Sequence, residues 1–353
     1  MIAAGVLMTD DDHRHPIESE QRRRRRSPRE PVSVWKEKEN LGGEVVDAGV
    51  VILRTSGCAH SRGGGCTMCG YNQESSEGIS SEDVIAQFRS ASKSLDGTQF
   101  LKVYTSGSFL DQREMPLDAQ KEILSWCRDS GRGLLFESRT EFITEDGLGA
   151  ALQVHDDIEV AIGLESANDR VLKFAINKDM TVADYDRAAS AVKSAGARLR
   201  SYVLLKPPYL TEAEAIEDAI STAKHAALMS DTISINPVNV QKGTIVERLW
   251  KSWSYRSPWL WSVIEVLNAC AELDRKVVCD PTGGGRERGA HNCGGCDEEA
   301  LSAIREFSLT QSRNKIQVSE CECHGLWETI RELEGLIVGG TPDLQRFFRK
   351  HGA

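Results

Sequence analysis

The sequence lacks any apolar run that could cross a bilayer. A membrane-spanning helix needs about 18 consecutive apolar residues, and no run in this chain of 353 residues approaches that length. The start of the chain has no basic segment and no long apolar segment, and three aspartates follow the first nine residues. It therefore does not resemble a signal peptide, and we expect a cytoplasmic protein without a membrane partner.

The chain also lacks an excess of basic residues. It carries 53 Asp and Glu against 43 Lys and Arg, which gives a formal net charge of −10. This balance argues against a generally cationic surface for nucleic acids, although it is compatible with a local basic patch. Aromatic residues make up 6% of the chain and hydrophobic residues 40%, which suffices for the core of one large domain or two smaller ones.

Residues 1–44 resemble a disordered, charged tail. They show little periodicity, and residues 22–26 are five consecutive arginines. Such a run usually belongs to a solvated segment. The alternative is an arm that contacts nucleic-acid phosphates.

From residue 45 onward, short β-branched apolar runs alternate with longer helical stretches. Six strand-then-helix units in a row predict a parallel sheet. The predicted fold class is α/β: a partial (β/α)6 TIM-like barrel over residues 45–279, then a small C-terminal Cys-rich metal-binding region over residues 280–353. Such barrels carry their chemistry at the carboxyl ends of the strands. The predicted strands are residues 49–54, 100–105, 133–137, 158–165, 199–205 and 231–238, and the predicted helices are a stretch from about 81 and residues 117–130, 169–175, 183–195, 212–229, 257–273, 297–308 and 324–337.

Seven of the ten cysteines fall into two groups, which points to metal binding where thiols are kept reduced. The first group is Cys58, Cys66 and Cys69, in the spacing Cys-x7-Cys-x2-Cys just past the first predicted strand. Three thiolates leave one iron of a [4Fe–4S] cluster without a protein ligand, and a cofactor or substrate can bind there. The alternative is a zinc site with a further ligand such as His60.

Polar residues follow the next strands at the same predicted edge. A turn of small residues suits close approach of a ligand to the backbone, a carboxylate can accept hydroxyl groups, and an arginine can bind a carboxylate through two bonds. A glutamate at the end of an apolar strand is costly unless it is paired or functional. The residues are Ser106, Gly107 and Ser108 after the second strand, Glu137, Ser138 and Arg139 after the third, and Glu165 at the end of the fourth.

Two weaker candidates follow the last predicted strands. Lys206 and Asn236 offer polar groups at the expected mouth of the barrel, and we assign them to the substrate. Helix capping and turn chemistry would explain the asparagine equally well. The alternative to a functional role for Glu137 and Arg139 is that they form an ordinary ion pair on the surface.

The second cysteine group has the spacing Cys-x2-Cys, then Cys-x-Cys after 24 residues. Four thiolates in two close pairs satisfy a closed, tetrahedral zinc site, and an iron–sulfur centre is the alternative. A closed site has no position for a substrate, so we expect a structural role. The ligands are Cys293, Cys296, Cys321 and Cys323, with His291 and His324 as neighbouring loop residues.

Together these motifs resemble the radical S-adenosylmethionine enzymes, in the branch with the elongator-protein-like core. The resemblance implies that Cys58, Cys66 and Cys69 hold a [4Fe–4S] cluster and are essential for catalysis, and that S-adenosylmethionine binds its open iron. It also implies that residues 106–108, 137–139 and Glu165 contact this cofactor. The family spacing is usually Cys-x3-Cys-x2-Cys with an aromatic residue before the last cysteine, where this chain has Met68. Tyr71 is the candidate for the missing aromatic contact.

The motifs Gly-Gly-Cys-Thr-Met-Cys-Gly-Tyr, Thr-Ser-Gly-Ser-Phe-Leu-Asp, Glu-Ser-Arg-x-Glu-Phe-Ile-Thr, Pro-Trp-Leu-Trp and His-Asn-Cys-x2-Cys occur in this order. The set is similar to the archaeosine-biosynthesis family of archaea over residues 45–350. This implies a tRNA substrate whose deazaguanine base carries a lysine, attached by a partner transferase. The radical would break the lysine carbon–nitrogen bond, with flavodoxin or ferredoxin as electron donor. The alternatives are another radical tRNA-modifying enzyme and a non-catalytic, metal-stabilised adaptor.

Overall fold

An eight-stranded sheet forms the centre of the molecule. The computed structural model describes residues 27–338, so the arginine run at 22–26 lies outside the described residues. The strands follow one another in chain order; β1 is antiparallel to β2, and β2 to β8 are parallel. The strands are β1 (Ser33–Leu41), β2 (Glu44–Ile52), β3 (Phe100–Tyr104), β4 (Gly133–Glu137), β5 (Ile158–Glu165), β6 (Arg198–Leu205), β7 (Thr232–Pro237) and β8 (Lys276–Cys279).

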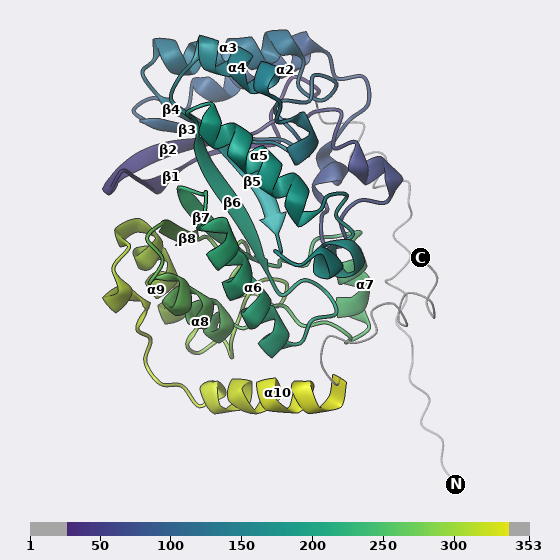
Figure 1. The fold of residues 1–353 in the computed structure, drawn as a ribbon, viewed down its shortest axis with the longest axis vertical. Coiled ribbons are helices and arrows are strands. Elements are labelled where there is room, and N and C mark those ends of the chain that lie inside the picture. The colour runs from purple at the N-terminus through teal and green to yellow at the C-terminus, as the bar shows by residue number, and fades with distance from the viewer. Residues whose placement is uncertain (1–26, 339–353) are drawn as a thin grey trace.

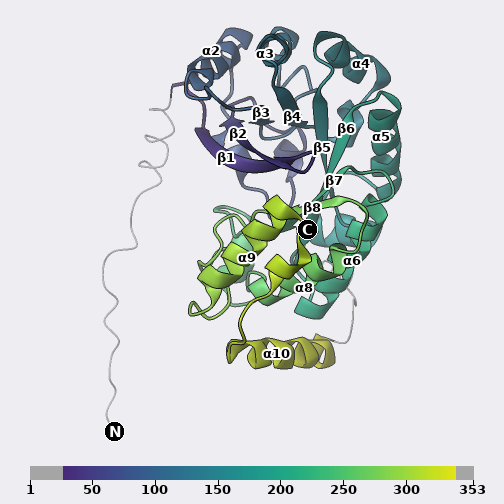
Figure 2. The same cartoon turned by 90° about the vertical axis from the view of Figure 1, so that its left-hand side faces the viewer.

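Helices connect the parallel strands and cover the outer face of the curled sheet (Figure 1, Figure 2). Ser80, Thr181 and Thr211 begin α2, α5 and α6 with capping boxes, which satisfy the first backbone N–H groups of each helix. The helices are α2 (Ser81–Ser92), α3 (Leu117–Asp129), α4 (Glu145–Val154), α5 (Val182–Ser194), α6 (Glu212–Ala226), α7 (Ile245–Lys251), α8 (Leu260–Cys270), α9 (Asp297–Thr310) and α10 (Cys323–Val338), with short helices η1 (His60–Gly63), η2 (Tyr71–Glu74), η3 (Thr140–Phe142), η4 (Val171–Ile176) and η5 (Arg313–Ile316).

The predicted α/β fold with a partial barrel is confirmed, with two corrections. A seventh parallel strand, β8, continues the sheet, and the antiparallel β1 precedes it. The tail predicted up to residue 44 is therefore wrong for its last part, because residues 33–41 pair with β2 through a two-residue turn at Gly42 and Gly43. In the described part of the chain we find no helix that is long and apolar enough to cross a membrane.

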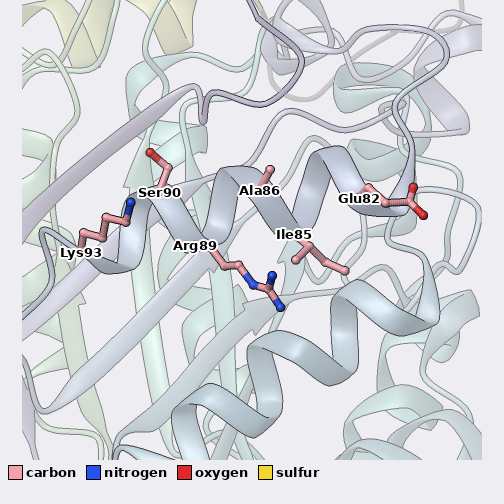
Figure 3. A pocket seen from close by; sticks show the side chains of 6 residues that line it. All are labelled: Glu82, Ile85, Ala86, Arg89, Ser90 and Lys93. Carbon is pink, nitrogen blue, oxygen red and sulfur yellow. The ribbon is translucent and has the colours of Figure 1, made fainter.

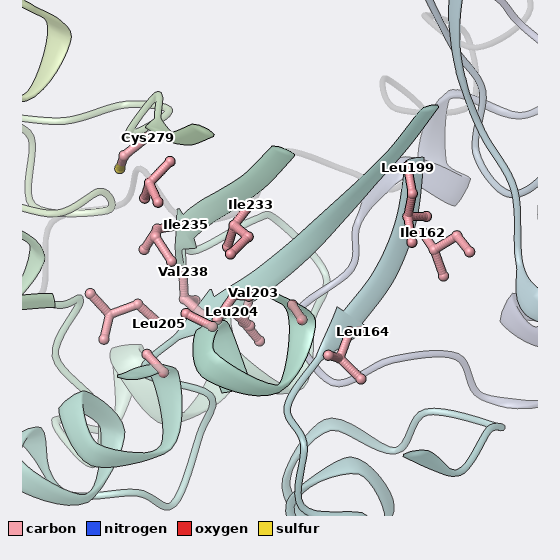
Figure 4. Packing of buried hydrophobic residues seen from close by; sticks show 14 of the residues in the cluster. Ile162, Leu164, Leu199, Val203, Leu204, Leu205, Ile233, Ile235, Val238 and Cys279 are labelled. Carbon is pink, nitrogen blue, oxygen red and sulfur yellow. The ribbon is translucent and has the colours of Figure 1, made fainter. Parts of the chain in front are cut away.

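The core lies between the sheet and its helices. Alternate residues of each strand point outward, as the two-residue period of a strand requires. They form one large buried cluster with the inner sides of the helices (Figure 4). Its members on the middle strands include Ile162, Leu164, Leu199, Val203, Ile233 and Ile235.

The inner face of the sheet carries a small apolar cluster of Ala48, Phe100, Leu135 and Ala161, and charges beside it. At the amino ends of the parallel strands, Arg200 Nε lies 2.9 Å from Glu159 Oε1, and its Nη2 lies 3.1 Å from Glu39 Oε1. Lys276 Nζ lies 3.3 Å from the same Glu39 oxygen, and Lys102 also pairs with Glu39. Because Glu39 is on β1 and Lys276 on β8, these ion pairs bring the two edges of the sheet together and close this end of the barrel.

Candidate active site at the carboxyl ends of the strands

The first cysteine group lies on the segment between β2 and α2, which contacts the segment after β5. Thr67 donates from its backbone N–H to the Ile176 carbonyl and from its hydroxyl to the Ala175 carbonyl, both at 2.8 Å. Asn177, in a left-handed conformation after η4, donates to the Gly65 carbonyl at 2.7 Å. The three cysteines are thus held at the predicted edge of the sheet.

The cysteine segment also contacts the segment between β7 and α7. The Gly70 N–H donates to Gln241 Oε1 at 2.5 Å, and the Val246 N–H donates to the Thr67 carbonyl at 3.2 Å. Gln73 donates to the Lys242 carbonyl. The segment therefore lies across the barrel mouth, fixed on two opposite sides.

The thiols of Cys58, Cys66 and Cys69, called here the front thiols, are arranged unlike the ligands of a single ion. In a compact metal site the donor atoms of three or more side chains lie within 4.8 Å of one another. In the part of the chain that the structure describes, only the rear cysteines meet this condition, and these are Cys293, Cys296, Cys321 and Cys323. The thiolates of a cubane bind different irons, so they stand farther apart than the ligands of one zinc ion. His60 Nε2 is hydrogen-bonded to the Asn177 carbonyl at 2.7 Å. This geometry favours the cluster over the zinc alternative.

The front thiols interact electrostatically with one another and with two cations. Burial raises the pKa of Cys66 to about 12 and also raises the pKa of Cys69. The charge of Cys69 interacts with those of Cys66 and Cys58, while Lys178 and Arg139 lower the pKa of Cys66. Three thiolates in this site would therefore be partly compensated by neighbouring positive charge.

Gly107 packs directly against the first cysteine. A Cβ atom at this position would lie 2.9 Å from both Cα and Cβ of Cys58 and 2.5 Å from Glu114 Oε2. The buried Glu114 accepts the N–H groups of Gly107 at 2.9 Å and of Ser108 at 2.7 Å, and the Thr55 hydroxyl at 2.8 Å. Glu114, which no motif of the sequence marks, holds the predicted small-residue turn in place.

The residues after β4 reach the same place. Arg139 Nη1 lies 3.9 Å from Cys58 Sγ, its Nε donates to Glu141 at 2.6 Å, and its backbone N–H donates to Ser108 Oγ at 3.0 Å. Burial, with a smaller contribution from the nearby Glu165, raises the pKa of the Glu137 carboxyl to about 7. The structure thus brings residues of two predicted motifs, 106–108 and 137–139, beside Cys58.

Two other predicted residues lie at this edge. Tyr71 is half exposed, and its carbonyl accepts the Ser106 hydroxyl at 3.2 Å. Ser138 is buried, and its N–H donates to the Ala161 carbonyl at 3.0 Å. Their contact with a cofactor stays a prediction.

Glu165 ends β5 with a positive φ of 65° and pairs with Lys178 at 2.8 Å. A Cβ on Gly163 would lie 2.3 Å from Glu165 Oε1 and 2.5 Å from Lys178 Nζ. Gly163 therefore makes room for this largely buried ion pair, whose side chains are 12% and 13% exposed. Sequence analysis missed Lys178, a single charge in a loop with no spacing signal.

Lys206, which was predicted to contact the substrate, has a different partner. Its ammonium group is buried and forms an ion pair with Glu212 of α6. Glu212 also accepts the Ser262 hydroxyl at 2.5 Å and the Trp259 N–H at 2.9 Å. These contacts give Lys206 a structural partner and oppose its assignment to the substrate.

The rear cysteines form a compact four-thiol site. The Sγ–Sγ distances along the ring are 3.9 Å for 293–296, 3.6 Å for 296–323, 3.5 Å for 323–321 and 3.7 Å for 321–293. Trp261 Nε1 donates to Cys323 Sγ at 3.2 Å and Asn292 Nδ2 to Cys296 Sγ at 3.3 Å. Four thiols at this spacing fit one ion, and the N–H donors would stabilise the thiolates.

A hollow along the outer face of α2 is unrelated to these sites (Figure 3). One helix supplies all of its lining side chains, and none of the predicted site residues is among them. The lining residues are Glu82, Ile85, Ala86, Arg89, Ser90 and Lys93.

The chain is similar to two archaeal proteins along most of its length. It is 39% identical over 324 residues to archaeosine synthase subunit beta of Methanosarcina acetivorans, covering 89% of this chain and 93% of the relative. It is 36% identical over 318 residues to the protein of the same name from Thermococcus kodakarensis, covering 87% and 98%. These relatives confirm the family resemblance that the motifs indicated. No family model matches the chain.

Solved structures with a similar fold include Elp3 of Methanocaldococcus infernus, with 16% identity, a TM-score of 0.47 and coverage of 81% of this chain and 63% of that one. Methylornithine synthase has 14% identity, a TM-score of 0.48 and coverage of 65% and 63%.

Proposed function

This chain belongs to the family of the archaeosine synthase beta subunits, and from that premise we propose that it is a radical S-adenosylmethionine enzyme of tRNA modification. In this proposal it acts on a tRNA whose deazaguanine base carries a lysine. The reaction breaks the lysine carbon–nitrogen bond and leaves the formamidine of archaeosine. A lyase-type reaction of this kind needs one hydrogen atom to be removed from the carbon next to the nitrogen.

One observation carries the proposal: three thiols, spaced too widely for one ion, lie across the barrel mouth beside a small-residue turn and two cations. A [4Fe–4S] cluster with S-adenosylmethionine supplies, on one-electron reduction, a 5′-deoxyadenosyl radical that abstracts hydrogen. Cys58, Cys66 and Cys69 would hold this cluster. Arg139 and Lys178 offset the negative charge of the thiolates, as neighbouring charges do around metal ligands.

The turn at residues 106–108 would bind a cationic group. Glu114 accepts the N–H groups of Gly107 and Ser108. An ammonium group only donates hydrogen bonds, so it would bind the carbonyl and hydroxyl oxygens of this turn. That suits the methionyl amine of S-adenosylmethionine. Glu137, whose pKa is about 7 because it is buried, would accept ribose hydroxyl groups.

The partners follow from the same proposal. The name subunit beta of the relatives supports a second subunit, which we take to be the tRNA lysine transferase. Flavodoxin or ferredoxin would supply the electron. The rear four-thiol site would hold a structural zinc ion, because its four protein ligands leave no open position.

The test is anaerobic. The chain is loaded with iron and sulfide and given dithionite and S-adenosylmethionine, and 5′-deoxyadenosine is measured with and without lysine-modified archaeal tRNA. We expect release that rises with the tRNA, with archaeosine appearing in the digested RNA. Cys66→Ala should lose the cluster and the release, while Cys127→Ala, a buried thiol outside both groups, should keep them.

The other outcomes separate the alternatives. Release that is independent of this tRNA would favour a radical enzyme with a different substrate. No release from a fully loaded cluster would favour the non-catalytic adaptor.

A further inference from the structure

Trp253 stands immediately after α7 in an unusual conformation. Its side chain is 96% exposed, and its φ is 60°. The Trp253 N–H donates to the Trp250 carbonyl at 3.1 Å, and the Ser254 N–H donates to the Leu249 carbonyl at 2.8 Å. This is the Schellman pattern, in which the left-handed position is usually glycine. A large aromatic residue is therefore held in solvent at a position that favours a residue without a side chain.

Three cations lie on the same segment of the chain as this indole. Lys242, Arg248 and Lys251 are exposed on α7 and the loop before it. The one acid of α7, Glu247, is buried and accepts from Arg288 at 2.8 Å and from the Gly243 N–H at 2.7 Å, and Lys251 Nζ lies 3.7 Å from it. Its single negative charge is outweighed by the cations around it, so the exposed side of α7 is positive in a chain with a net charge of −10.

This surface adjoins the barrel mouth. The loop that carries Lys242 is the one whose Gln241 and Val246 are bonded to the cysteine segment. Figure 1 shows α7 on the same side of the sheet as the short helices that follow β2. A molecule bound to α7 would therefore reach the edge where the three front cysteines lie.

We propose that the α7 surface, formed by Lys242, Arg248, Lys251 and Trp253, binds the RNA strand next to the nucleotide that enters the barrel. The indole offers a stacking face for an unpaired base, and the cations bind phosphates on either side, the combination by which proteins bind single-stranded RNA. The inference rests on the proposed function, since it assumes that the substrate is RNA. It explains how an acidic chain approaches a polyanion.

The test uses the full chain in complex with its transferase partner and fluorescently labelled, lysine-modified archaeal tRNA. Trp253→Gly removes the indole and at the same time gives the left-handed position its preferred residue, so it should raise the thermal midpoint. We expect it to weaken RNA binding roughly tenfold, as loss of one stacked base does. The double variant Arg248→Gln, Lys251→Gln should weaken binding and lower the slope of log Kd against log salt by about 1 to 2.

The matched control is Arg89→Gln, Lys93→Gln, which makes the same charge change on the outer face of α2. RNA affinity of both α7 variants equal to that of this control would overturn the inference, as would a complex that binds no tRNA at low salt. A photocrosslinker at position 253 gives a second readout. Attachment to RNA supports the inference, and attachment to the partner polypeptide overturns it.

These outcomes are distinct from failure of the proposed function. Release of 5′-deoxyadenosine by the wild-type chain reports on the radical chemistry without reference to α7. If tRNA binding depends on α7 but no 5′-deoxyadenosine is released, only the proposed function is contradicted. If tRNA stimulates release of 5′-deoxyadenosine but the α7 variants bind tRNA normally, only the inference about α7 is contradicted.

Discussion

Gly107 is the residue on which the front site depends most directly. In Gly107→Ala the new Cβ would lie 2.9 Å from the backbone Cα of Cys58, and backbone cannot move aside as a flexible side chain can. We expect the cysteine segment to shift and most of the cluster to be lost. Iron and sulfide content per chain, with the visible absorbance of the cluster, measures this.

Gly63 supplies the control within the same segment. No heavy atom lies within 4 Å of a Cβ at this position, and its backbone conformation is an ordinary one. Gly63→Ala should therefore load iron as the wild type does. Full loading of Gly107→Ala would mean that the turn does not press on Cys58 when the cluster is bound.

Asp218 gives a prediction about pH. Burial raises the pKa of its carboxyl to about 6, while its hydrogen bond from Ser166 at 2.8 Å opposes the shift. The native state therefore holds this proton more tightly than the unfolded state, and stability is lost as pH rises from about 4 through 6. Asp218→Asn should be more stable than wild type at pH 8, by roughly 1 to 3 kcal/mol, with little difference at pH 4. Thermal midpoints at both pH values check this, and equal effects at the two would contradict it.

Single residues show where prediction from the sequence ends. Spacing and strand ends located the cysteines, Gly107, Arg139 and Glu165 at one edge, because parallel strands deliver their carboxyl ends together. Glu114 and Lys178 were missed, since a lone charge in a loop looks the same whether it binds a backbone turn or faces solvent. Lys206 was assigned to substrate because its partner, Glu212, belongs to the following helix and only the fold brings the two together.

At the scale of elements, apolar periodicity predicted β4 and β5 with their observed bounds. It missed β1, whose alternating Lys and Glu residues resemble a solvated tail. Glu37 and Glu39 instead point inward and meet Lys102, so the alternation is that of a strand with a charged inner face. Gly42 and Gly43, a typical two-residue hairpin turn, were the signal that could have found it.

We expect metal binding at the rear site to stabilise α10. This helix begins at Cys323 and is held by Trp327 Nε1, which donates to Ser262 Oγ at 2.9 Å, and by the Arg331–Glu265 pair at 2.7 Å. Structural metal binding contributes folding free energy, so Cys296→Ala should release the metal and loosen α10. We expect faster hydrogen exchange in α10 and unchanged exchange in β4 and β5.

Metal analysis of the wild-type chain complements that measurement. One zinc ion per chain, additional to the iron of the front cluster, is the expected result. Iron and sulfide in the Cys66→Ala variant, which lacks the front cluster, would instead identify the rear site as an iron–sulfur centre. Cys270→Ala, a buried thiol of α8 outside both groups, should keep the metal.

At the scale of the whole molecule, the carboxyl and amino ends of the barrel differ in how they are covered. In the proposed function the carboxyl end admits a cofactor and a substrate, and the cysteine segment lies there, hydrogen-bonded to the segments after β5 and β7. The amino end can be closed permanently, and buried ion pairs across the sheet edges close it. Glu39 lies at the centre of these pairs. Burial alone would raise its pKa, but Arg200, Lys102 and Lys276 together hold the pKa well below its ordinary value.

Glu39→Gln tests whether this closure stabilises the entire barrel. Removing the carboxylate leaves three buried cations with fewer counter-charges, which should destabilise the fold by about 3 to 5 kcal/mol. Chemical denaturation measures the change. Lys38→Gln on the same strand breaks only an exposed pair with Asp47 and should cost less than about 1 kcal/mol. Equal effects of the two variants would mean that β1 is retained by its pairing with β2 alone, and that the contact between the sheet edges adds no stability.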